Sequence, residues 1–94
     1  MERLFIRYTG RVQGVGFRVT VADLAADFEV VGRVCNVDDR SVQLEVEGED
    51  EELLRFREAI AHRLHRHIVT AEENWSAIGQ ASWSDFAVAQ DKRL

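Results

Sequence analysis

The sequence of 94 residues contains no proline and a single cysteine, and both shortages narrow the possible architectures. Because neither a proline, a Ser/Gly run nor an internal repeat marks a linker, we predict one small domain over residues 1–94. The lone Cys35 cannot form an intrachain disulfide, and it cannot build a metal site by itself. We interpret it as a small, half-buried strand residue, since unpaired cysteines usually pack as small hydrophobes.

Long apolar runs and an excess of positive charge are missing as well. Charged side chains interrupt residues 1–7, so this segment resembles neither a signal peptide nor a membrane span. Twelve basic and seventeen acidic side chains give a net charge of −5, which disfavours nucleic acid or an anionic membrane as a partner. We therefore expect a cytoplasmic monomer, with no nucleic-acid or membrane partner, that captures any anion locally.

The most informative stretch runs from Gly10 to Arg18 and reads Gly-Arg-Val-Gln-Gly-Val-Gly-Phe-Arg. Its glycines let backbone N–H groups approach a ligand, and a helix beginning near Phe17 adds unpaired N–H groups and a positive dipole end. Arg18 falls in the first helical turn, where a cation is unfavourable unless an oxyanion binds beside it. We call residues 11–18 the cradle and predict that it binds phosphate. The predicted phosphate-binding residues are Arg11, Val12, Gln13, Gly14, Val15, Gly16, Phe17 and Arg18.

The cradle differs from the common nucleotide-binding loops. It does not end in the Gly-Lys-Ser/Thr of a Walker A loop, and Val19 occupies the place of the third glycine in a dinucleotide fingerprint. We therefore do not expect it to bind a nucleotide.

Hydrophobic periodicity predicts an α+β fold. Apolar residues alternate over residues 3–9 and 41–47, which indicates two half-buried strands, with Glu47 facing outward in the second. Helical stripes run from Phe17 to Phe28 and from Leu53 to Leu64. Further strands are expected at residues 30–36 and 67–75, with a hairpin turn at 37–40 and a short last strand within 83–90. This order predicts a ferredoxin-like β-α-β-β-α-β sandwich, with an antiparallel sheet, two helices on one face and a short extra C-terminal strand.

That topology predicts a site at one edge of the sheet. The first and second strands run parallel, so the cradle after the first and Asn36 at the end of the second converge, about 10 Å apart across two strand spacings. By propensity alone an asparagine at a strand end is more often a turn residue. The neighbouring cradle favours a site role for Asn36 together with Arg18.

Residues 10–18 resemble the acylphosphatase signature G-x-V-Q-G-V-x-F-R, and residues 32–48 resemble a second element of that family with gaps. The resemblance implies hydrolysis of small acyl phosphates to carboxylate and inorganic phosphate, without a cofactor, metal or covalent intermediate. It implies that Arg18 binds the phosphoryl oxygens and that Asn36 orients the attacking water, as the two catalytic residues. The chemistry is consistent with the residues present, because an acyl phosphate has a good leaving group and needs mainly orientation and charge stabilisation.

Several positions depart from the family pattern. Val21 stands where the family usually has threonine, one helical turn after the arginine, and the Gly-Pro that frequently follows the second helix is missing. Glu29 replaces the glycine that normally ends the first helix, Arg33 replaces an aromatic residue, and Arg40 replaces a turn glycine. None of these changes removes a catalytic atom, although they make low activity or a changed acyl preference plausible.

Two other functional classes compete with an enzyme, and a metal site is a separate question. The cradle and the Val-Cys-Asn string also resemble the acylphosphatase-like domain of hydrogenase-maturation carbamoyltransferases, which suggests a non-catalytic phosphate-binding or regulatory domain. An RNA-recognition module shares the topology, but the strand at 41–47 presents polar rather than stacking aromatic residues outward. His62 and His65 lie one helical turn apart and could suggest a metal, but a cationic helix C-terminus already accounts for them.

Overall fold

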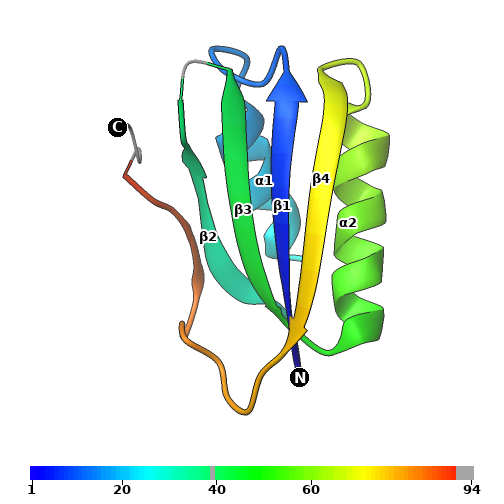
Figure 1. Ribbon diagram of the computed structural model, residues 1–94, viewed down its shortest axis with the longest axis vertical. Helices are drawn as coiled ribbons and strands as arrows, with labels where there is room; N and C mark the ends of the chain where they lie inside the picture. The colour runs from blue at the N-terminus through cyan, green and yellow to red at the C-terminus, as the bar shows by residue number, and fades with distance from the viewer. Residues whose placement is uncertain (39, 91–94) are drawn as a thin grey trace.

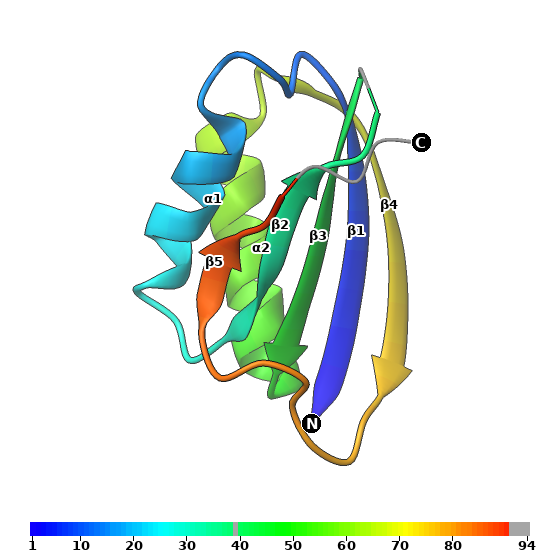
Figure 2. The same ribbon diagram turned by 90° about the vertical axis from the view of Figure 1, so that its left-hand side faces the viewer.

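The computed structural model describes residues 1–38 and 40–90, which form a five-stranded sheet with both helices packed on one face (Figures 1 and 2). The elements in chain order are β1 (Glu2–Gly10), α1 (Phe17–Ala25), β2 (Val31–Asn36), β3 (Ser41–Gly48), α2 (Asp50–Leu64), β4 (Ile68–Ala77) and β5 (Phe86–Val88). The strand order is β4-β1-β3-β2-β5. The predicted ferredoxin-like α+β architecture is therefore confirmed, including the extra C-terminal strand.

One part of the predicted sheet needs correction. The neighbours β4, β1, β3 and β2 pair antiparallel, as expected, but β5 pairs parallel with β2 through the register Gly32↔Phe86 to Val34↔Val88. The sheet is therefore mixed at this edge. The long loop between β4 and β5 explains the direction, because it returns the chain past the sheet to the far side of β2 (Figure 2).

The core lies between the sheet and the two helices. Inward side chains of β1 and β3 alternate as predicted, and Leu4, Ile6, Val42 and Leu44 are all fully buried. They meet the apolar stripes of the helices, whose periodicity keeps one side against the sheet. The buried residues of α2 are Leu53, Phe56, Ile60 and Leu64. Within the part of the chain that the structure describes, no helix combines the length and apolar character that a membrane crossing requires.

Helix α1 is shorter than the stripe of apolar residues from Phe17 to Phe28 predicts. It ends at Ala25, and Phe28 lies in the following turn with its ring 5.6 Å from the ring of Phe56. The last turn closes through tight bonds to the third preceding residue, such as Phe28 N–H to Ala25 O at 3.1 Å. Because Glu29 stands in place of a terminal glycine, the helix ends without the left-handed cap that glycine provides.

Glu47 is buried, although the alternation of β3 predicts an outward, exposed position. Its place in the alternation of β3 puts it on the outer face of the sheet, away from the helices, but its side chain is 0% exposed and contacts both Arg3 and, in the loop between β4 and β5, Ser82. Its Oε2 accepts hydrogen bonds from Arg3 Nε and Nη2 at 2.9 and 2.7 Å, and its Oε1 accepts one from the Ser82 N–H at 2.6 Å. Burial opposes ionisation, but the Ser82 and Arg3 donors outweigh it and lower the pKa of Glu47.

Arg33 on β2 also contacts the loop between β4 and β5. Its Nη1 donates to the Asp85 carbonyl at 2.9 Å, and its guanidinium lies 5.8 Å from the ring centroid of Trp83. The arginine that replaces an aromatic residue of the family pattern therefore packs against an aromatic residue supplied by the loop.

Candidate active site

The cradle joins the C-terminal end of β1 to the start of α1 at one end of the molecule (Figures 1 and 2). Gly14 and Gly16 have φ angles of +75° and +76°, a region that glycine adopts without the strain of a side chain. A Cβ added at either position would meet no atom within 4 Å. The backbone conformation, rather than crowding, therefore requires glycine at these two positions.

The two helices begin differently. The first turn of α2 carries Asp50, Glu51 and Glu52, which compensate its positive dipole end. Helix α1 begins after Gly16, which has no side chain to cap it, and its first turn contains no acidic residue but does contain Arg18. The start of α1 thus concentrates positive potential and backbone N–H groups at the cradle, which suits an anion.

Both ends of the cradle are anchored to the body of the protein. The side chains of Val12 and Phe17 are 1% exposed, and the Phe17 ring packs against Tyr8 with 5.2 Å between ring centroids. The Arg11 N–H donates to the His67 carbonyl at 2.9 Å, which ties the cradle to the turn between α2 and β4. Val12 and Phe17 could therefore meet a ligand only through their backbone, whereas residues 14–16 at the tip are exposed.

Gln13 has a role that the sequence does not reveal. Its side-chain Nε2 donates to the carbonyl of Ser41 at 2.9 Å and also contacts the carbonyl of Asp38. Asp38 lies in the connection between β2 and β3, where the sequence predicts a hairpin turn at residues 37–40, and Ser41 is the first residue of β3. Asp39 lies outside the described residues. The Gln13 amide therefore ties the cradle to this hairpin, and its partners are backbone atoms that no side-chain motif could indicate.

Asn36 ends β2 beside the cradle, as predicted from the parallel course of β1 and β2. It pairs with Val42, which in turn pairs with Tyr8, so the three residues form one row across the sheet. Asn36 is 6% exposed, and among the described residues its buried Oδ1 has no hydrogen-bond partner. Buried oxygens of Glu2, Tyr8 and Ser41 share this condition. Because a buried acceptor left unpaired costs about 1–3 kcal/mol, a water molecule or ligand group that donates to Asn36 Oδ1 would be favoured.

Arg18 is half-buried in the first turn of α1, and two of the departures from the family pattern, Val21 and Arg40, lie on α1 and on the hairpin that the cradle contacts. Val21 is fully buried in the core, where the hydroxyl of a threonine would need a partner. Arg40 is exposed, and its backbone N–H donates to Asp38 Oδ1 at 2.8 Å. Val21 thus packs in the core, and Arg40 forms part of the turn at Asp38.

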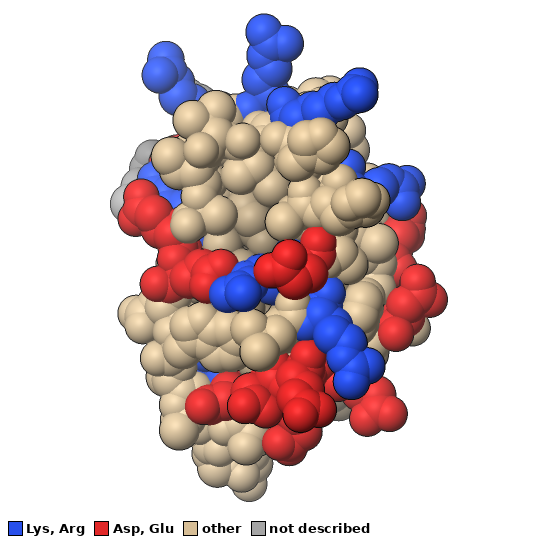
Figure 3. All heavy atoms as spheres, turned by 90° about the vertical axis from the view of Figure 1, so that its right-hand side faces the viewer, with Lys and Arg blue, Asp and Glu red and all other residues tan. Residues whose placement is uncertain are grey.

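Charge is distributed unevenly over the molecule. On the face drawn in Figure 3, one end carries basic side chains, the middle carries side chains of both signs, and acidic side chains gather toward the opposite end. Helix α2 contributes to this separation, with acidic residues in its first turn and His62 and Arg63 in its last. The turn that follows α2 is bonded to the cradle, so an anion is attracted to this end despite the net charge of −5.

The histidines do not assemble into a metal site in the part of the chain that is described. His65 Nδ1 lies 3.0 Å from the His62 carbonyl oxygen. Over residues 1–38 and 40–90, no three His, Cys, Asp or Glu side chains come together as a metal ion would require.

Comparison with known protein families identifies one profile. The Acylphosphatase family matches residues 4–88, which is most of the chain. A curated acylphosphatase of Clostridium acetobutylicum is 45% identical over 56 residues, covering 60% of this chain and 62% of the relative. Another, from Thermotoga maritima, is 41% identical over 70 residues, covering 74% and 78%. The match to the first of these spans about three fifths of the relative's length.

Solved structures agree with the fold. The acylphosphatase of Bacillus subtilis superposes with a TM-score of 0.82 at 29% identity, covering 95% of this chain and 99% of that chain. Full-length HypF, solved in a phosphate- and nucleotide-bound form, superposes with a TM-score of 0.78 at 26% identity. That match covers 98% of this chain but 12% of HypF.

Proposed function

The chain belongs to the acylphosphatase family, and we propose that it hydrolyses the carboxyl-phosphate bond of small acyl phosphates. The products are a carboxylate and inorganic phosphate. The observation that carries the proposal is the unpaired, buried Oδ1 of Asn36 at the strand end beside the cradle.

The cradle binds the phosphoryl group in this proposal. Arg18 places two guanidinium donors on the phosphoryl oxygens, and backbone N–H groups of residues 11–18 complete the cradle. Side chains of Val12, Phe17 and Gln13 hold the loop in shape, since two are buried and the third is bonded to the hairpin. The positive end of α1 stabilises the charge that develops on the phosphoryl oxygens in the transition state.

Asn36 orients the nucleophile. Its Oδ1 accepts a hydrogen bond from a water molecule, which fixes that water for attack on phosphorus in line with the departing carboxylate. The P–O bond to the acyl group breaks, the carboxylate leaves with the bonding electrons, and a phosphate oxygen takes the proton of the water. Neither Arg18 nor Asn36 can act as a general base near neutral pH, so the substrate supplies this function.

No covalent intermediate or metal is needed in this scheme. The cradle offers no Ser, Cys, His or Asp nucleophile, and Arg18 together with the helix dipole supplies the positive charge. We further propose that the chain is a single cytoplasmic domain that acts as a monomer on small molecules. Its net charge of −5 supports small anionic substrates rather than nucleic acid or an anionic membrane.

The likeness to HypF supports a second candidate, a phosphate-binding or regulatory domain without catalysis. Turnover of benzoyl phosphate by the purified chain, followed by its ultraviolet absorbance, separates the two. The enzyme proposal requires turnover that Arg18→Gln nearly abolishes. Phosphate binding without turnover would favour the regulatory domain, and turnover unaffected by Arg18→Gln would reject the proposed site.

A further inference from the structure

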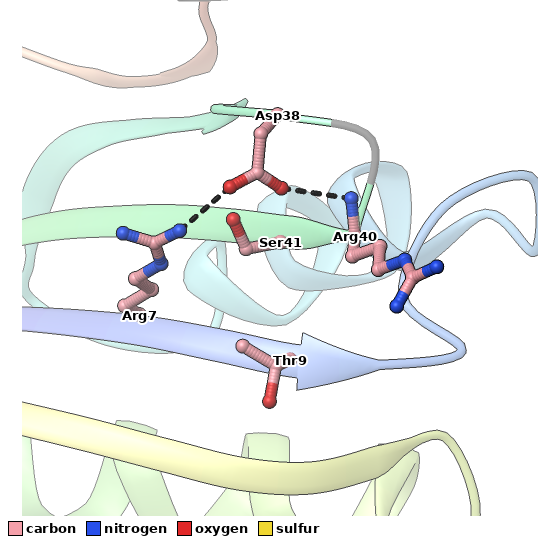
Figure 4. A pocket seen from close by; sticks show the side chains of 5 residues that line it. All are labelled: Arg7, Thr9, Asp38, Arg40 and Ser41. Atoms are coloured by element: carbon pink, nitrogen blue, oxygen red, sulfur yellow. Dashed lines mark hydrogen bonds and ion pairs between the residues drawn. The ribbon is translucent and has the colours of Figure 1, made fainter.

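A pocket of about 380 Å³ lies on the outer face of the sheet, at the hairpin between β2 and β3, and Asp38 forms one of its walls (Figure 4). The Asp38 carboxylate is bound from two directions. Arg7 Nη2 on β1 donates to Oδ2 at 2.6 Å, and the Arg40 N–H donates to Oδ1 at 2.8 Å. Asp38 is thus fastened both to the neighbouring strand and to its own turn.

The backbone of the same residue is bonded to the cradle. Gln13 Nε2 contacts the Asp38 carbonyl and donates to the Ser41 carbonyl at 2.9 Å. The Ser41 carbonyl also accepts the Val37 N–H at 3.1 Å, which closes the end of the hairpin next to Asn36. Asp38 therefore makes two kinds of contact. Its side chain forms an ion pair with Arg7 on the outer face of the sheet, and its backbone carbonyl contacts Gln13 of the cradle.

We propose that Arg7 and Asp38 are positioning residues, whose ion pair holds the hairpin so that Gln13 sets the cradle at the correct distance from Asn36. The inference rests on the proposed function of the cradle and Asn36. It adds two residues that contact neither the substrate nor the reacting water. The route runs from Arg7 through Asp38 to Gln13, with one hydrogen bond at each step.

This pair is better suited to positioning than to stabilising the fold. The Arg7 and Asp38 side chains are 43% and 47% exposed, and ion pairs of that exposure contribute little to the free energy of unfolding. Catalysis is far more sensitive to position, since about 1 Å of misplacement can cost roughly 10²-fold in rate. Loss of the ion pair should therefore lower kcat more than it lowers the free energy of unfolding or the affinity for phosphate.

The test compares Arg7→Gln, Asp38→Asn and the double variant with the wild type, using benzoyl phosphate turnover and phosphate titration. We expect each single variant to lower kcat about fivefold, a partial effect of the misplacement described above, with phosphate affinity and Tm nearly unchanged. The kcat of the double variant should be no lower than that of either single variant, because all three variants break the same ion pair. Equal losses in kcat and phosphate affinity, or additive losses, would overturn the proposal.

Arg57→Gln is the matched control. It breaks the 2.9 Å ion pair between Arg57 on α2 and Glu73 on β4, whose side chains are 29% and 28% exposed, and which does not involve the hairpin. We expect kcat to stay at the wild-type value in this variant. A fall equal to that of Arg7→Gln would mean that any lost surface pair has the same effect and would reject the positioning role.

Nuclear magnetic resonance of 15N-labelled protein gives an answer that does not require turnover. Arg7→Gln should shift the side-chain amide resonances of Gln13 and the cradle amides, whereas Arg57→Gln should leave them in place. If the wild type fails to hydrolyse any acyl phosphate, the proposed function falls, and these resonances still decide whether Arg7 sets the cradle. Unmoved Gln13 resonances in Arg7→Gln would overturn the inference whatever kcat does.

Discussion

Replacing Asn36 by alanine should lower the enzymatic rate strongly while it changes the free energy of unfolding little, because the side chain is buried but its Oδ1 bonds to no other described residue. Truncation to alanine therefore breaks no hydrogen bond of this oxygen within the described protein. What is lost is the packing of a small amide group, worth about 1 kcal/mol. The free energy of unfolding of Asn36→Ala should therefore lie within about 1 kcal/mol of the wild-type value.

Val34→Ala is the matched control, since Val34 lies two residues earlier on the same face of β2 and is fully buried in the core. The loss of two methyl groups in Val34→Ala should lower the free energy of unfolding by about 2 kcal/mol. For a domain of this size, 1 kcal/mol corresponds to about 4–8 °C in Tm, so urea and thermal unfolding resolve the difference between the two variants.

Activity should rank the two variants in the opposite order. Asn36→Ala should lower kcat by about 10² or more while leaving phosphate affinity nearly unchanged, because a water-orienting group acts mainly in the transition state. Val34→Ala should keep its kcat at a temperature where it is folded. An Asn36→Ala protein that unfolds about 2 kcal/mol more easily and retains wild-type kcat would show that Asn36 is structural and would refute the reasoning.

Three further outcomes follow from the same site and fold. Arg18→Gln should lower turnover and phosphate affinity together, with Arg18→Lys only a partial rescue, because paired guanidinium donors are lost; a wild-type phosphate titration in Arg18→Gln would contradict this. The rate should be flat between about pH 5 and 8 and insensitive to EDTA, since the proposed scheme uses no general acid or base of the protein and no metal; a bell-shaped profile or EDTA inhibition would contradict it. The pKa of Glu47 is lowered in the folded state, so its contribution to stability is present above the unfolded value of 4.5 and is lost as the pH falls through the folded value. Glu47→Gln should therefore be less stable at neutral pH and approach the wild type in acid, and a constant difference in urea unfolding across this range would exclude the linkage.

The sequence predicted best the elements whose pattern is set by burial on one face. Strand β3 and helix α2 were recognisable because one face of each packs into the core, which imposes a period of two or of 3.6 on the apolar residues. The placement of Asn36 beside the cradle followed from topology, since two strands that are both antiparallel to β3 must end at the same edge. These are local or topological constraints, and both are visible in the order of residues.

Contacts between distant segments could not be predicted in this way. Glu47 alternates correctly onto the outer face, but its burial depends on Ser82, 35 residues further on. Gln13 stays a predicted phosphate-binding residue of the cradle, but the bonds of its side chain to backbone carbonyls 25 and 28 residues away could not be predicted, because backbone atoms leave no signature in side-chain chemistry. The parallel pairing of β5 was missed because it depends on where a long loop returns to the sheet.

The most direct test of the central claim, that the cradle binds the phosphoryl group through Arg18, is the stabilisation of the folded protein by inorganic phosphate. At ten times its dissociation constant, phosphate should stabilise the wild type by about 1.4 kcal/mol, or several degrees in Tm, and the effect should saturate. Arg18→Gln shares any general stabilisation by excluded phosphate but lacks the specific donors, so it should gain clearly less at matched ionic strength. Equal increments in the two proteins, without saturation at low phosphate, would contradict the account.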